Sequence, residues 1–148
     1  MKALNIEIKE GTLEQVAALS QQIPEFIDPH PLTEYQKRLR GKVHLILIAY
    51  IDQQAAGFKV GYERADYFYS WMGAISPTYR RRNLATLLAE KQEAWAKEKG
   101  YSKIVFKTRN HLKPMLLFAL KRGFNIISVE EKETVEAYRI LLQKTLKN

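Results

Sequence analysis

The segment Tyr67–Ile75 constrains the fold of this chain more than any other stretch of its sequence. It reads Tyr-Phe-Tyr-Ser-Trp-Met-Gly-Ala-Ile, so that apolar and aromatic side chains occur at both odd and even positions. Such a run favours an extended strand whose two faces are both covered by other parts of the protein. We therefore predict that residues 67–75 form a central strand of a sheet.

Apolar patterns along the rest of the chain predict an α/β protein of the α+β kind. A first strand is expected at residues 4–8, followed by a helix that begins with a capping box at Thr12 and Gln15. No internal repeat or long linker divides the 148 residues, so a single domain spanning 1–148 is expected. The other predicted elements are strands at 43–51, 55–62, 101–106, 124–131 and 136–143, and helices at 33–39, 84–99 and 114–121.

The composition excludes several kinds of site. The chain has no cysteine, which rules out disulfides, thiolate metal ligands and a cysteine nucleophile. Its three histidines lack metal-ligand spacing, so no metal is expected. No apolar run approaches the roughly 20 residues of a membrane helix, and the first residues do not resemble a signal peptide. We expect a cytoplasmic protein that does not bind membranes.

Positive charge is concentrated in one region of the chain. Residues 80–122 carry a net charge of +9, from twelve lysines and arginines and three glutamates, whereas the whole chain carries +8. Such a region attracts nucleic acid, an anionic membrane surface or a polyphosphate, and charge alone does not choose among them. Nucleic-acid binding is not favoured, because the basic helix offers only Trp95 for stacking, and its apolar stripe assigns Trp95 to the core.

A basic loop between the central strand and the next helix is suited to bind a polyphosphate. It reads Arg80-Arg81-Arg82-Asn83-Leu84-Ala85 and enters the helix at about Leu84. The first turn of a helix has unpaired backbone N–H groups and the positive end of the helix dipole. Asn83 tolerates a left-handed bend, and Ala85 leaves space for close approach. We predict that N–H groups from Arg81 to Thr86 bind the anion with help from the arginines; a solvated basic turn is the alternative.

Two separated motifs relate the chain to a known family. Ile75-Ser76-Pro77 precedes Arg80-x-x-Asn83-x-Ala85, and Asn110 is followed by Lys121-Arg122-Gly123-Phe124. In both motifs the chain resembles the GCN5-related N-acetyltransferase (GNAT) family, whose acyl-CoA loop reads Gln/Arg-x-x-Gly-x-Gly/Ala. The resemblance in element order extends from about Leu4 to Ile140. Asn83 replaces the usual first glycine, which is compatible with binding if residue 83 contributes only its backbone N–H.

The resemblance implies a mixed, mostly antiparallel sheet of about seven strands flanked by about four helices. It also implies an acyl-CoA-dependent N-acyltransferase that uses acetyl-CoA and in which an amine attacks the thioester directly. Gly73 supports a ligand site on the central strand independently of the resemblance, since glycine within a strand often marks a bulge or a closely approaching ligand. Plain packing against an aromatic neighbour is the alternative explanation for this glycine. The implied cofactor-binding residues are Gly73, Ala74, Ile75, Arg80, Arg81, Arg82, Asn83, Leu84, Ala85, Thr86 and Asn110.

The proton-transfer groups are less clearly marked. A general base must lie within reach of the attacking amine, and the candidates are Glu63, Asp66 and His30. We select Glu63, which is near the end of the strand before the central one; an ordinary surface carboxylate is the alternative. Tyr69 and Ser70 on the central strand are candidates to contact the substrate or relay a proton, with core packing as the alternative.

One position departs from the family in a way that concerns catalysis. The family often has a tyrosine four residues before the glycine of its Gly-Phe pair, where it protonates the departing thiolate, and this chain has Ala119 there. A non-catalytic acyl-CoA-binding sensor, or a degenerate family member, is therefore the alternative function.

The acceptor and the oligomeric state are indicated only weakly. The proline-rich connector 24–32 is expected to wall the acceptor pocket. Four glutamates near the last strand connection slightly favour a cationic acceptor, although a solvated hairpin also explains them; they are Glu130, Glu131, Glu133 and Glu136. Exposed edges of the terminal strands favour a homodimer.

Overall fold

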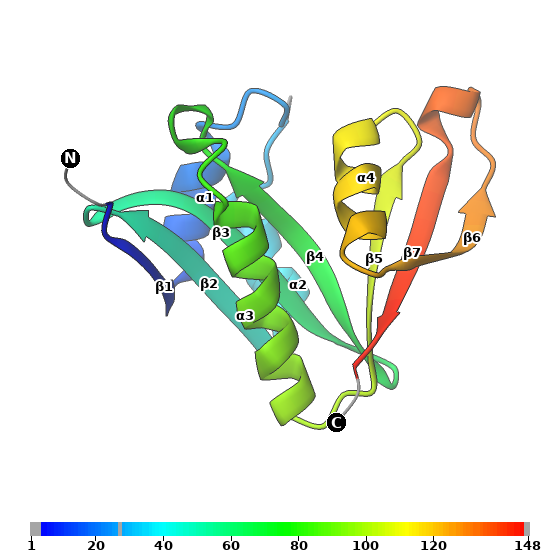
Figure 1. Ribbon diagram of the computed structural model, residues 1–148, viewed down its shortest axis with the longest axis horizontal. Helices are drawn as coiled ribbons and strands as arrows, with labels where there is room; N and C mark the ends of the chain where they lie inside the picture. Colours follow the sequence, from blue (N-terminus) through cyan, green and yellow to red (C-terminus); the bar gives the residue numbers. More distant parts are fainter. Residues whose placement is uncertain (1–3, 27, 147–148) are drawn as a thin grey trace.

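A seven-stranded mixed sheet forms the centre of the structure, a computed structural model that describes residues 4–26 and 28–146 (Figure 1). Its strand order is β1-β2-β3-β4-β5-β7-β6, and every neighbouring pair is antiparallel except β4 and β5. The predicted mostly antiparallel sheet is thereby confirmed. The strands are β1 Ile6–Glu10, β2 His44–Ile51, β3 Gln54–Arg64, β4 Tyr67–Ile75, β5 Lys103–Arg109, β6 Asn125–Glu130 and β7 Arg139–Thr145.

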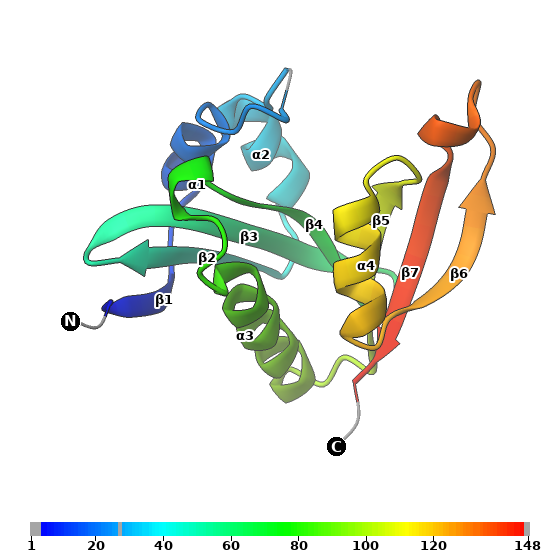
Figure 2. The same cartoon turned by 45° about the horizontal axis from the view of Figure 1, so that its top comes forward.

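Four α-helices cover the two faces of this sheet, as predicted. Helices α1 (Leu13–Ser20) and α2 (Leu32–Leu39) lie on one face, whereas α3 (Leu84–Glu98) and α4 (Lys113–Lys121) lie on the other (Figures 1 and 2). Each pair of helices has its own apolar core against the sheet. We refer to the two sides as the α1/α2 face and the α3/α4 face. None of the helices in the described residues is long and apolar enough to cross a membrane.

Strand β4 is central, as its two-sided apolar sequence predicts. It is the fourth of the seven strands, with β3 on one side and β5 on the other. Phe68 is fully buried and packs against Trp95 and Tyr101 on the α3/α4 face. Tyr69, the next residue, is 6% exposed and packs against Tyr62 in the other core. Successive side chains of a strand point to opposite faces, so one apolar run supplies both cores.

Two predicted boundaries differ from the structure at the ends of the chain. The first strand begins at Ile6 and continues to Glu10, because its backbone pairs with β2 as far as Leu47. The last strand begins at Arg139, since residues 135–137 form a short 3₁₀ helix, η2. Pairing with the neighbouring strand decides where β1 and β7 begin and end, and the polar–apolar pattern of the sequence does not reveal this pairing.

Candidate active site

The central strand β4 and its neighbour β5 separate after two residue pairs. Phe68 pairs with Ile104 and Tyr69 with Val105, and no later residue of β4 pairs with β5. Strand β4 nevertheless continues beside β3 as far as Ile75. Figure 1 shows β4 and β5 diverging over this length. Their facing edges therefore carry backbone N–H and C=O groups without a strand partner. An extended ligand that contains amide groups can pair with these edges as an added strand would.

A register shift between β3 and β4 places a β-bulge at Trp71. Consecutive residues of β3 pair with Ser70 and Met72, so Trp71 is the extra residue of β4. The sequence pointed to a bulge or a close ligand at Gly73, but Gly73 pairs in regular register with Lys59. Trp71 keeps a negative φ, which explains why this bulge needs no glycine. A close approach of ligand at Gly73 stays a prediction.

Lys59 lies beside Gly73, where a methyl side chain would also fit. A Cβ atom added at residue 73 would lie 3.5 Å from Cγ and 3.7 Å from Nζ of Lys59, which are ordinary contact distances. Enclosure on the α3/α4 face lowers the pKa of Lys59 to about 8, while the Glu93 carboxylate opposes part of this shift. Lys59 therefore loses its proton more readily than an exposed lysine.

The basic loop has the backbone conformation that its sequence predicts. After the short 3₁₀ helix η1 (Pro77–Tyr79), both Arg81 and Asn83 are left-handed, with φ values of 64° and 65°. In the described chain, the N–H groups of residues 81–86 donate no backbone hydrogen bond, whereas that of Leu87 donates to the carbonyl of Asn83. Successive N–H groups in such a turn line a concave surface, and here they are followed by the N-terminus of α3. This combination is suited to bind a phosphate or pyrophosphate.

The arginine side chains of this loop are not equivalent. Arg80 donates through Nε to the carbonyl of Ile75 at 3.0 Å and forms a two-pronged ion pair with Glu25 at 2.8 and 2.9 Å. These hydrogen bonds lower the pKa of Glu25 and raise the pKa of Arg80. Arg81 and Arg82 are exposed and form no ion pair with the described residues. Arg80 thus links the loop to the connector between α1 and α2, and the other two are directed to solvent.

Asn110 holds the end of β5 against the last strand connection. Its Nδ2 donates to the carbonyl of Val135 at 3.1 Å, and its Oδ1 accepts from Nζ of Lys113 at 3.0 Å. Its backbone N–H donates to the carbonyl of Tyr138. The contacts of Asn110 are therefore with the chain itself, and its predicted contact with the cofactor remains a prediction.

Helix α4 ends as the Gly-Phe motif predicts. Gly123 has a φ of 95°, and the N–H of Phe124 donates to the carbonyl of Ala119 at 3.0 Å. This is the left-handed C-terminal turn that favours glycine. The side chain of Ala119 is 2% exposed and belongs to the core on the α3/α4 face. A methyl group there has no proton to give to a leaving thiolate.

The three predicted catalytic side chains are divided between the two faces of the sheet, with Glu63 and Ser70 on the α3/α4 face and Tyr69 on the other. Glu63 accepts a hydrogen bond from the phenol of Tyr101 at 2.7 Å, on the α3/α4 face. Burial and this carboxylate raise the pKa of Tyr101 to about 12. Tyr69 lies in the core of the α1/α2 face, and Ser70, 8% exposed, follows it and points to the other face. Glu63 and Tyr69 therefore cannot act on the same group from one side of the sheet.

Aromatic and basic side chains that no sequence motif marks surround Tyr69. The Trp71 ring packs against the rings of His30, Tyr35 and Tyr62, with centroids 5.2 to 5.8 Å apart. The pKa of Tyr69 is raised, mainly by burial and next by Tyr62, against the opposing effect of nearby arginines. Its phenol is therefore neutral at neutral pH and can donate a hydrogen bond. We refer to His30, Tyr35, Tyr62, Tyr69 and Trp71 as the aromatic wall.

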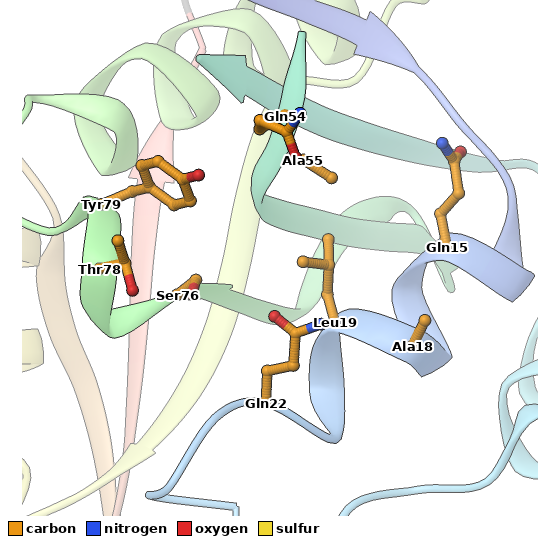
Figure 3. A pocket seen from close by; sticks show the side chains of 9 residues that line it. All are labelled: Gln15, Ala18, Leu19, Gln22, Gln54, Ala55, Ser76, Thr78 and Tyr79. Atoms are coloured by element: carbon orange, nitrogen blue, oxygen red, sulfur yellow. The ribbon is translucent and has the colours of Figure 1, made fainter. Parts of the chain in front are cut away.

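A separate shallow pocket lies beside the start of β3 (Figure 3). Three segments line it, namely α1 with the turn that follows it, the start of β3, and the turn after β4, and Figure 3 shows their side chains around the hollow. None of the lining side chains is charged; they are Gln15, Ala18, Leu19, Gln22, Gln54, Ala55, Ser76, Thr78 and Tyr79. This pocket therefore has no ionic partner for a phosphate. No group of three or more His, Cys, Asp or Glu residues in 4–26 and 28–146 is arranged to hold a metal ion.

The sheet splits at its parallel strand pair, and the N-terminus of α3 with its free N–H groups follows the end of β4. Together these features define an acyltransferase-type fold with an anion-binding loop. The model of the acetyltransferase (GNAT) family matches residues 13–124. The chain belongs to this family. No curated protein sequence matches the chain.

Solved structures of other acetyltransferases share the fold. The ribosomal-protein-S18-alanine N-acetyltransferase from Escherichia coli has a TM-score of 0.85 at 15% identity, covering 97% of this chain and 96% of that one. Ard1 from Thermoplasma volcanium has a TM-score of 0.82 at 12% identity, covering 97% and 99%. PaiA N-acetyltransferase from Thermoplasma acidophilum, solved in complex with coenzyme A, has a TM-score of 0.70 at 15% identity, covering 95% and 99%. At these identities the likeness concerns the fold.

Proposed function

We propose that this chain, acting as one domain, transfers an acetyl group from acetyl-CoA to a primary amine of a small molecule or peptide. The observation that carries the proposal is the loop of left-handed residues and free N–H groups at the start of α3. This loop follows the end of β4, whose edge toward β5 is unpaired beyond Tyr69. A coenzyme with a pyrophosphate and an amide-containing arm has the chemistry to use both features.

Each part of the site has a distinct task in this proposal. The N–H groups of residues 81–86 bind the pyrophosphate, while Arg81 and Arg82 add positive charge from the solvent side. The free edge of β4 along Gly73, Ala74 and Ile75 pairs with the amide-containing arm and orients the thioester. A backbone N–H of the same edge stabilises the oxyanion when the amine attacks.

The reaction is a direct transfer without an intermediate on the protein. The amine nitrogen forms a bond to the thioester carbon, the carbon–sulfur bond breaks, and the thiolate leaves. The amine loses a proton to the solvent, and the thiolate gains one. We propose that Tyr69 contributes as a neutral hydrogen-bond donor or relay rather than as a base, because burial raises its pKa. Glu63 is the weaker candidate, since its carboxylate already accepts the Tyr101 hydroxyl.

Ala119 favours a second candidate function, a protein that binds acyl-CoA without turnover. No other described side chain on α4 near this position supplies a phenol, so thiolate protonation depends on water or on a group outside α4. Release of free thiol from acetyl-CoA across a broad panel of amines separates the two functions. Enzyme-dependent release with any amine excludes the non-catalytic form, whereas saturable binding without release from any amine supports it.

Binding of acetyl-CoA is tested with variants of the exposed loop arginines. We expect Arg81→Gln/Arg82→Gln to weaken acetyl-CoA binding at least about tenfold, since charge-assisted phosphate contacts contribute roughly 1.5–3 kcal/mol. The matched control is Lys91→Gln/Lys97→Gln, which removes two exposed charges from the outer side of α3. Calorimetric titration that gives the same Kd for both double variants overturns the proposed contribution of Arg81 and Arg82 to phosphate binding.

We also propose that two copies of the chain associate through β6. Within residues 4–26 and 28–146 this edge strand pairs only with β7, and its apolar residues Ile126, Ile127 and Val129 are 48 to 52% exposed. A long apolar edge is normally protected, and antiparallel pairing with a second copy across a two-fold axis protects it here. Light scattering after size exclusion is expected to show a dimer, which Ile127→Lys disrupts and Ile127→Val retains. A monomeric wild-type protein at high concentration contradicts this.

A further inference from the structure

Five basic side chains from four elements meet on the α1/α2 face at the inner end of the opening between β4 and β5. The guanidinium of Arg64 and the ammonium of Lys107 lie 4.9 and 5.8 Å from the ring centre of Tyr69. The guanidinium of Arg38 lies 4.7 Å from the ring centre of Trp71. We call this group the cation cluster; it consists of Arg38, Arg64, Lys107, Arg109 and Arg139.

Two members of the cation cluster oppose each other in the sheet. Arg109 of β5 and Arg139 of β7 are direct partners in the antiparallel ladder. Like charges in such a pair project from the same face and destabilise the sheet. Lys107 lies two positions before Arg109 on β5, so it points to the same face. The fold therefore maintains a repulsive arrangement at this place.

Few carboxylates compensate the cation cluster. Glu34 pairs with Arg38 at 3.3 Å, and Glu130 lies 3.7 Å from Arg139 but also binds Lys132 at 2.6 Å. In the described residues, the other three members form no ion pair. Loss of hydration and then the nearby arginines lower the pKa of Lys107, and Glu130 opposes this only in part. The α1/α2 face therefore has an uncompensated positive potential beside Tyr69.

The position of the cation cluster separates it from the phosphate-binding loop. Tyr69 is the last residue of β4 that pairs with β5, whereas the loop follows the other end of β4, beyond Ile75. At about 3.3 Å per residue, the two places are roughly 20 Å apart along the strand. A coenzyme pyrophosphate at the start of α3 does not reach the cation cluster. Beside the cluster, a pocket lined by Arg109, Lys132, Glu133 and Ala137 is open to solvent.

We propose that the acceptor amine carries a negatively charged group, a carboxylate or a phosphate, and that the cation cluster binds this group against the aromatic wall. This inference rests on the proposed acetyltransferase function, because it names the substrate class of the same site. Arginines bind carboxylate and phosphate oxygens in a two-pronged geometry, and His30 and Trp71, the partly exposed members of the aromatic wall, supply a surface for the carbon part of a small amine. The positive potential also lowers the pKa of a nearby ammonium, which increases the neutral fraction that can attack the thioester.

Glu130, one of the four acidic residues near the last strand connection, does not cancel this positive potential. The amino-acid sequence alone slightly favoured a cationic acceptor because of Glu130 and its neighbours. In the structure, Glu130 is shared between Lys132 and Arg139, and these contacts, Lys132 first, lower its pKa. Its charge is therefore engaged by the chain, and the geometry favours an anionic acceptor.

The test compares amines that differ only in the anionic group. Acetyl-CoA-dependent thiol release is measured with glycine and glycinamide and with phosphoethanolamine and ethanolamine, which also separates a carboxylate from a phosphate. The charged member of at least one pair is expected to have a kcat/KM at least about tenfold higher, as a charge-assisted contact provides. Arg64→Gln/Lys107→Gln is expected to reduce this ratio to near one, mainly through KM. The control Lys91→Gln/Lys97→Gln is expected to retain it.

A binding measurement that needs no acetyl transfer distinguishes failure of this inference from failure of the proposed function. Two pairs of acetylated products, N-acetylglycine with N-acetylglycinamide and N-acetylphosphoethanolamine with N-acetylethanolamine, are titrated while the fluorescence of Trp71 is followed, with Trp95 replaced by phenylalanine. Preference for the charged product that is lost in Arg64→Gln/Lys107→Gln supports the inference even in a protein that does not turn over. Equal binding of the charged and neutral products in both pairs, or better turnover of the neutral amines, overturns the inference while leaving acetyl transfer intact.

Discussion

The left-handed conformation of Asn83 allows a direct test of backbone binding in the loop before α3. Asn83 has φ 65° and ψ 15°, and its side chain makes no capping hydrogen bond. Glycine adopts this conformation freely, whereas a β-branched residue is strained there by roughly 1–2 kcal/mol or more. We expect Asn83→Gly to retain both stability and acetyl-CoA binding. Asn83→Val is expected either to lower the free energy of unfolding by that strain or to relax the loop. Relaxation of the loop would displace the N–H groups that bind the phosphates.

The expected loss of affinity follows from the same energies. A relaxed loop that misaligns one or two N–H···O⁻ contacts, each contributing about 1.5–3 kcal/mol, weakens acetyl-CoA binding by about tenfold to several hundredfold. Isothermal titration measures Kd, and urea unfolding without ligand measures the strain. Asn125→Val, at an exposed position of β6, is the matched control and is expected to change neither quantity by much. If Asn83→Val binds as tightly as Asn83→Gly, the backbone conformation is not the source of phosphate binding.

Two further predictions concern the sheet. The pKa of Tyr101 is raised to about 12, so the folded state retains a proton that the unfolded chain loses near pH 10. The hydroxyl of Tyr101 therefore contributes to the free energy of unfolding in full below pH 10, and this contribution is lost as the pH rises toward 12. Absorbance titration of the tyrosines is expected to show a late step that Glu63→Gln moves to lower pH, whereas turnover persists in that variant. Gly61→Ala is expected to cost about 1–3 kcal/mol, since its Cβ would lie 2.4 Å from the Phe68 ring, whereas Gly73→Ala, with 3.4 Å of clearance, is expected to cost less in urea unfolding.

The parts of the fold that could be predicted are those encoded in local patterns. The two-sided apolar run of Tyr67–Ile75 predicts a central strand, and β4 is central. The left-handed bend at Asn83 was also predictable, because few residue types other than glycine tolerate it. The order and spacing of such local signals along the chain are enough to indicate the family.

The features that could not be predicted depend on register and on which face a side chain occupies. No local pattern indicates that Glu63 and Tyr69, both selected as catalytic candidates, lie on opposite faces of the sheet. The bulge at Trp71 arises from strand pairing and carries no residue signature. The cation cluster joins residues as distant in sequence as Arg38 and Arg139, and nothing local indicates that they meet.

The two-pair junction between β4 and β5 also bears on the stability of the protein. In the described residues, strand pairing links the two halves of the sheet at only two positions, and the apolar core that contains Phe68, Ile104 and Leu142 holds the halves together. On the proposed function, bound acetyl-CoA lies along the unpaired edge and acts as a temporary strand that closes the seam. Ligand at 100 times its Kd would add about 2.7 kcal/mol to the free energy of unfolding. Each release of coenzyme A then leaves this edge of β4 unpaired again.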